Sequence, residues 1–173
     1  MILAGVGFGG TDHVGLTVPD LDEAIAFFEQ VFGAQTILRH PGYSPSAEVN
    51  VGNFAREPEV TVEGIAMVRV AGMNFELLQY ENDSMSGQWP TTDATGGHHV
   101  AFYVADLDRA VVQLRAASVE VLGDPLAMGG PEAGPGARFV YFRAPWGMFF
   151  ELVSYPSGKA YESSTFARLA TPR

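Results

Sequence analysis

The fold of this chain is decided by a stretch that occurs twice: residues 12–25 read DHVGLTVPDLDEAI and residues 98–111 read HHVAFYVADLDRAV. At a constant offset of 86 residues, seven of these fourteen positions are identical. A second pair follows in the same order, with MNFELLQY at 73–80 and MFFELVSY at 148–155, and five of its eight positions are identical. Two dense matches in the same order indicate an internal duplication.

Each half of the duplication predicts the element order βαβββ. The first strand is followed by a helix that begins after Asp20 or Asp106, because aspartate is a favoured N-cap residue. Apolar residues recur at helical spacing, and Gly33 suits the end of the first helix. Further strands are expected at roughly 34–39, 60–71 and 73–80 in the first half and at roughly 119–122, 137–144 and 147–154 in the second.

We therefore expect one α+β domain over residues 1–173, built from two βαβββ modules. Its parts are module one at about 11–80, a linker at 81–97, module two at about 98–156 and a polar tail at 157–173. The two offsets, 86 and 75 residues, show that the first half carries eleven extra residues. We place this surplus at 40–59, which is rich in Pro, Gly, Ser and Asn and predicts a loop.

The composition excludes several classes of protein. The chain has no cysteine, which rules out a disulfide framework, a cysteine-based zinc site and a thiol nucleophile. Its net charge of −10 argues against a nucleic-acid partner. The N-terminal stretch MILAGVGFGG lacks a basic region and its apolar run is short, so we expect neither a signal peptide nor a membrane span and predict a cytoplasmic protein.

The duplication repeats two polar residues inside otherwise apolar strands. His13 and His99 occupy the first strand of each half, and Glu76 and Glu151 occupy the last. A single strand histidine or glutamate is usually a packing or solvated residue, but two matched pairs suit one divalent metal such as Ni, Co, Zn, Mn or Fe. His98 has no histidine counterpart in this register, so we expect it to face away from the site.

The segments DHVGLTVPDLDEAIAFFEQVFGA, GGHHVAFYVADLDRAV and GMFFELVSYP resemble the vicinal oxygen chelate superfamily of glyoxalases, bleomycin-resistance proteins and extradiol dioxygenases. The resemblance covers about residues 11–156. It implies a cupped, partly closed sheet around a metal held by His13, Glu76, His99 and Glu151. It also implies Glu151 as the catalytic base, with Glu76 as the symmetry-related alternative. Homodimers are common in the superfamily, so we expect one, with the site built within one chain or shared between two.

The number of ligands separates the chemistries of the superfamily. Four protein ligands leave two positions of an octahedral ion for a bidentate substrate, whereas ring-cleaving dioxygenases need three. We expect a metal-dependent, glyoxalase-like lyase, isomerase or epimerase that moves a proton beside the carbonyl of a small-molecule substrate through a metal-stabilised enolate. The alternatives are a ring-cleaving Fe(II) extradiol-type dioxygenase and a non-enzymatic protein that binds a drug or metabolite.

Two named activities remain open because the chain departs from both patterns. The resemblance to bacterial glyoxalase I would place Arg and Asn where Thr17 and Tyr80 stand. The resemblance to methylmalonyl-CoA epimerase would place Gln where Glu76 stands.

Four residues are candidates for substrate contacts. Thr17 and Tyr103 should share the strand faces of His13 and His99, because side chains alternate along a strand. Trp146 follows Pro145 at an expected hairpin, and Arg56 lies in the 40–59 stretch, where it could meet an anionic group. For each residue the alternative is a packing or surface role.

Overall fold

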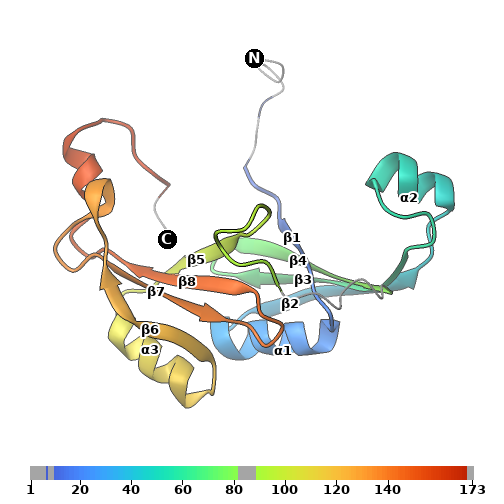
Figure 1. Cartoon of the computed structure of the whole chain (residues 1–173), viewed down its shortest axis with the longest axis horizontal. Coiled ribbons are helices and arrows are strands. Elements are labelled where there is room, and N and C mark those ends of the chain that lie inside the picture. The colour runs from blue at the N-terminus through green and yellow to red at the C-terminus, as the bar shows by residue number, and fades with distance from the viewer. Residues whose placement is uncertain (1–6, 8–9, 82–88, 171–173) are drawn as a thin grey trace. The chain divides into compact units, whose positions relative to one another are not determined.

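The fold is taken from a computed structural model of the chain (Figure 1). The described residues are 7, 10–81 and 89–170. The chain divides into two compact units, Met1–Ser86 and Gly87–Arg173. The first unit contains module one and the second contains module two, so each holds one copy of the duplicated sequence. Residues 82–88 of the predicted linker lie outside the described residues. A single domain that spans both modules stays a prediction.

Module one is a four-stranded mixed sheet with the strand order β1-β4-β3-β2. Its elements are β1 (Val14–Thr17), α1 (Leu21–Phe32), β2 (Gln35–Tyr43), α2 (Ala47–Phe54), β3 (Thr61–Val70) and β4 (Met73–Glu81). Strand β1 runs parallel to β4, and the other neighbouring strands are antiparallel. The duplicated first and last strands of the module are therefore direct neighbours, and this brings His13 beside Glu76.

Module two repeats this topology with the strand order β5-β8-β7-β6. Its elements are β5 (His99–Tyr103), α3 (Leu107–Ala116), β6 (Glu120–Ala127), the 3-10 turn η2 (Gly130–Glu132), β7 (Arg138–Arg143), β8 (Phe149–Ser154) and the 3-10 turn η3 (Ala160–Ser163). Strand β5 again runs parallel to β8. The predicted α+β fold of two related modules is confirmed, and both four-stranded sheets are open rather than closed barrels.

The helix boundaries follow the predicted capping residues. The Asp20 side chain accepts a hydrogen bond from the backbone N–H of Glu23, and Asp106 accepts one from Arg109. Helix α1 ends at Gly33, whose φ of 63° lies in the left-handed region that favours glycine. Both predicted N-caps and the predicted helix end are thus confirmed.

One helix covers one face of each sheet (Figure 1). In module one, Phe28 of α1 packs against Phe75 of β4 with ring centroids 5.4 Å apart, and both side chains are fully buried. In module two, Phe150 of β8 is likewise fully buried. Because neighbouring side chains on a strand point to opposite faces, Glu76 and Glu151 lie on the face opposite the helix. The burial of the aromatic residues therefore fixes the direction of the carboxylates.

The 40–59 stretch differs from the predicted loop. Strand β2 continues to Tyr43, and α2 occupies Ala47–Phe54, which Figure 1 shows standing away from the sheet of its module. The helix begins after Ser46, whose hydroxyl accepts from the backbone of Val49. Asn50 is completely buried and donates through Nδ2 to the carbonyls of Pro58 and Val60 at 3.0 and 2.9 Å. These bonds to the segment that follows α2 stabilise a helix that the local sequence does not favour.

No helix among the described residues has the length and apolar character that a membrane crossing requires.

Candidate functional site

The first half-site is a histidine–glutamate pair, with His13 directly before β1 and Glu76 on β4. The His13 Nε2 atom lies 3.5 Å from the Glu76 Oε2 atom. The Asp12 carboxylate lies 2.7 Å from the opposite ring nitrogen, Nδ1 of His13. This hydrogen bond raises the pKa of His13, and the charge of Glu76 acts in the same direction. A carboxylate on one imidazole nitrogen directs the other nitrogen toward the site, as in many metal-binding histidines.

The second half-site repeats the pair on β5 and β8 at a shorter distance. The His99 Nε2 atom lies 3.1 Å from the Glu151 Oε2 atom, and the Tyr141 ring packs edge-on against the imidazole at 5.1 Å. The side chain of Glu151 is 13% exposed, compared with 28% for Glu76. Burial raises the pKa of Glu151, and the nearby charge of His99 partly opposes this increase. The Glu151 carboxyl group is therefore less exposed to solvent than the Glu76 carboxyl group.

Both half-sites have the donor set and spacing that a divalent metal requires. Two ligand atoms that each lie about 2.1 Å from an ion, at a right angle, are about 3.0 Å apart. The 3.1 Å distance in module two matches this spacing and the 3.5 Å distance in module one is slightly wider. Within either module, the described residues contain no group of three or more potential ligands. Each pair thus needs further ligands, and the convergence of both pairs on one ion stays a prediction.

Tyr80 lies four residues beyond Glu76 on the same strand face, and its ring contacts the side chain of Arg56. The Arg56 guanidinium lies between two rings, with its Cζ atom 4.5 Å from the centroids of both Phe54 and Tyr80. It donates to the Tyr80 hydroxyl at 2.5 Å. No ion pair among the described residues includes Arg56. The predicted substrate residue Arg56 is therefore held beside the first half-site. Among the described residues, no carboxylate forms an ion pair with its guanidinium.

Module two has a corresponding tyrosine and cation beyond Glu151. The Lys159 Nζ atom lies 4.7 Å from the ring centroid of Tyr155 and bonds to Glu132 at 2.5 Å. The Lys159 side chain is 8% exposed, so it is largely buried. Sequence reasoning missed Lys159 because it lies in the polar tail, although the tyrosine was visible at the end of both repeated segments.

The remaining predicted substrate residues take different positions. Thr17 ends β1 and is exposed on the strand face of His13. Tyr103, at 36% exposure, packs edge-on against Tyr155 at 4.8 Å. The ring of His98 lies 5.6 Å from that of Trp89 rather than beside Glu151. His98 thus takes no part in the second half-site.

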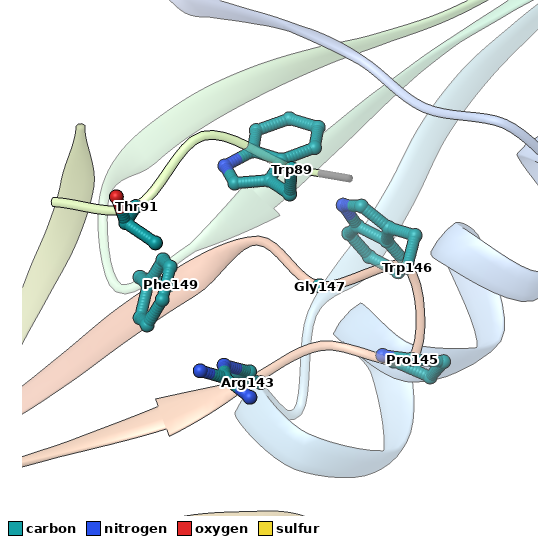
Figure 2. A pocket seen from close by; sticks show the side chains of 7 residues that line it. All are labelled: Trp89, Thr91, Arg143, Pro145, Trp146, Gly147 and Phe149. Atoms are coloured by element: carbon teal, nitrogen blue, oxygen red, sulfur yellow. The ribbon is translucent and has the colours of Figure 1, made fainter. Parts of the chain in front are cut away.

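Trp146 lines a cavity of about 470 Å³ in module two (Figure 2). Figure 2 shows Trp89 and Thr91 on one side of this space and residues of the β7–β8 connection on the other. The lining residues are Trp89, Thr91, Arg143, Pro145, Trp146, Gly147 and Phe149. Sequence reasoning missed Trp89 because it belongs to the predicted linker, outside both repeated segments.

Comparison with known proteins places the chain in a family. Residues 12–142 match the Glyoxalase/Bleomycin resistance protein/Dioxygenase superfamily. The chain belongs to this superfamily. As a superfamily member, it has the two βαβββ modules that the resemblance predicted, and a glyoxalase family protein from Bacillus cereus has a similar fold. That structure has a TM-score of 0.66 and 22% identity, and the alignment covers 87% of this chain and 97% of the other.

Two curated relatives of this superfamily member are epimerases. The chain is 40% identical over 166 residues to a 2-epi-5-epi-valiolone epimerase from Actinomyces sp, and the alignment covers 92% of this chain and 87% of that protein. It is 29% identical over 123 residues to the mitochondrial methylmalonyl-CoA epimerase of Bos taurus, and the alignment covers 70% of this chain and 61% of that protein. The relatives thus support an enzyme of the epimerase type.

Proposed function

We propose that this chain is a metal-dependent epimerase that moves a proton on the carbon beside the carbonyl of a small hydroxylated ketone. The observation that carries this proposal is the His–Glu pair that occurs on matching strands of both modules, at 3.5 and 3.1 Å. The 40% identity to a 2-epi-5-epi-valiolone epimerase supports epimerisation over ring cleavage or drug binding.

The donor set of both half-sites fits a divalent metal, which His13, Glu76, His99 and Glu151 would hold. Such an ion would supply the positive charge that stabilises negative charge on the carbonyl oxygen of the substrate. Asp12 keeps the Nε2 atom of His13 directed at Glu76 through its 2.7 Å bond to Nδ1. Tyr141 packs against His99 and restricts the orientation of that imidazole.

Glu151 is the proposed base that removes the proton. Its carboxyl group is mostly buried, and burial raises its pKa toward the range in which a carboxylate accepts a proton more readily. Epimerisation must return a proton to the opposite face of the carbon, so a second group is needed. Glu76 is the proposed partner, since it is the matching carboxylate of the other module.

Arg56 is proposed to bind an oxygen of the substrate. Phe54 and Tyr80 hold its guanidinium from both sides, so the group is positioned before a ligand arrives. Thr17, Tyr103 and Trp146 remain proposed substrate contacts on the basis of their strand faces and the cavity. The small-molecule substrate, the homodimer and the cytoplasmic location also remain proposals.

Deuterium incorporation tests the proposed reaction. The metal-loaded protein is incubated with 2-epi-5-epi-valiolone in D2O, and the carbon beside the carbonyl is followed by NMR. We expect uptake of one deuterium at that carbon together with epimerisation, and loss of both in the metal-depleted protein. Absence of exchange with this ketone would contradict the proposal.

A further inference from the structure

Both tryptophans of the chain line the cavity of module two. The sequence contains two tryptophans, and Trp89 and Trp146 face the same space of about 470 Å³. This volume lies in the range of small-molecule sites, which is about 300–1,000 Å³. Phe149 also lines the cavity, and its strand partner in the parallel register is His99. The cavity is therefore next to the second half-site along β8.

A tight turn positions the two indoles. The backbone N–H of Gly147 donates to the carbonyl of Ala144 at 2.9 Å, and Pro145 takes the second position, where its fixed φ is favourable. Gly147 has a φ of 94°, and a Cβ atom there would lie 3.2 Å from the Cβ atom of Trp89. Glycine thus permits both the turn and the close approach of Trp89 at this edge of the cavity.

The lining of the cavity offers apolar ring faces and hydrogen-bond donors. Trp89, Trp146 and Phe149 supply the faces. The indole N–H of Trp89 is buried and has no acceptor among the described residues. Arg143 lies over Phe149 at 4.9 Å and donates one bond to Glu120, which leaves further guanidinium N–H groups for a ligand. No carboxylate or histidine is among the described lining residues.

This chemistry selects a particular class of ligand. A ring that has an apolar face and oxygen atoms at its edge satisfies both the aromatic surfaces and the donors. A coenzyme A thioester fits poorly, because it carries several phosphate charges. The one cation in the described lining, Arg143, is already paired with Glu120 at 3.0 Å.

We propose that the cavity bounded by Trp89, Trp146 and Arg143 holds the hydroxyl-bearing part of a six-membered ring ketone and thereby selects this substrate class over acyl-CoA thioesters. This inference rests on the proposed epimerase function, because the carbonyl end of the ring would face His99 and Glu151. Trp89 and Trp146 are then specificity-determining residues of the reaction.

Tryptophan fluorescence tests the proposal directly, because all tryptophan emission of the chain comes from this cavity. The full chain is loaded with Zn²⁺ and titrated with a pentahydroxycyclohexanone, and in a separate titration with free coenzyme A. We expect a saturable change of emission with the cyclohexanone and none with coenzyme A. In Trp89→Leu and Trp146→Leu, the remaining tryptophan should report a dissociation constant raised about tenfold.

Arg109→Gln is the matched control. Arg109 is exposed on α3, which covers the opposite face of the same sheet. The Arg109→Gln variant should therefore bind the cyclohexanone with the affinity and the emission change of the wild type. Absence of a saturable response to the cyclohexanone while 2-epi-5-epi-valiolone still exchanges deuterium would overturn the cavity proposal and leave the epimerase intact. A response to coenzyme A at lower concentration than to the cyclohexanone would overturn the substrate class. A normal response without any exchange would contradict the epimerase function alone.

Discussion

Replacement of Asn50 should reveal how the segment that carries Arg56 is held in place. The Asn50 side chain is completely buried, and its Nδ2 atom donates to the carbonyl oxygens of Pro58 and Val60. The backbone carbonyl of Asn50 also accepts from the N–H of Arg56 at 2.9 Å. The Asn50 side chain therefore links α2 to the chain that leads into β3, with Arg56 between them.

The cost of Asn50→Ala follows from the two hydrogen bonds that it removes. Each bond contributes about 1 kcal/mol net, so the free energy of unfolding should fall by about 2 kcal/mol. Asn50→Asp keeps the shape but turns a carboxylate oxygen toward two carbonyl oxygens. At about pH 7 it should therefore cost more than Asn50→Ala, because a buried charge without a donor is added to the loss of both bonds.

The pH dependence of Asn50→Asp has a definite sign. Burial and the facing carbonyls raise the pKa of this aspartate in the folded state above its unfolded value of about 3.9. The folded state then binds more protons than the unfolded state, so stability increases as pH falls through the raised pKa. A protonated carboxyl group can also donate one of the lost bonds. The difference between Asn50→Asp and Asn50→Ala should hence shrink between about pH 7 and about pH 5.

Urea unfolding followed by circular dichroism measures these differences, with each variant compared with the wild type at the same pH. A loss below about 0.5 kcal/mol for Asn50→Ala would refute the proposed link, because that is the range of ordinary surface substitutions. Equal stability of the Asp and Ala variants at about pH 7 would refute the assigned direction of the amide.

Three further predictions concern activity and assembly. Glu151→Gln keeps an oxygen ligand but removes the base, so epimerase turnover should fall by about 10²–10⁴-fold with metal content retained, and full turnover would eliminate Glu151 as the base. Arg56→Gln should raise KM for the ketone by about tenfold with folding unchanged. The control Arg39→Gln, which removes an exposed ion pair with Asp22, should leave KM unaltered. If both variants change KM equally, Arg56 is not a substrate contact. The chain should be a homodimer by light scattering at micromolar concentration, and a monomer there would disprove this expectation.

The duplicated positions explain why the fold and both half-sites could be predicted from sequence. Each glutamate that the repeat preserves lies between apolar neighbours that must face a helix. Phe75 and Leu77 are fully buried under α1, so Glu76 between them has to point to the opposite face. The same alternation places Glu151, and the parallel pairing of first and last strands brings each histidine to its glutamate.

The elements that sequence reasoning missed depend on contacts made far along the chain. Helix α2 contains a glycine and two asparagines, which are weak helix formers, and it is stabilised by the bonds of Asn50 to a later segment. Lys159 and Trp89 lie outside the repeated segments, so no internal comparison could identify them. Their partners, Tyr155 and the turn at Gly147, become visible only once the chain is folded.

Calorimetric titration of the metal-free protein with Co²⁺ tests the central claim most directly. One ion held by both His–Glu pairs predicts a stoichiometry of one per chain. His13→Ala and His99→Ala come from different modules, yet each should weaken binding by at least about a hundredfold, because loss of a ligand costs no less than loss of an outer partner. Two ions per chain, or unchanged affinity in either variant, would contradict the account.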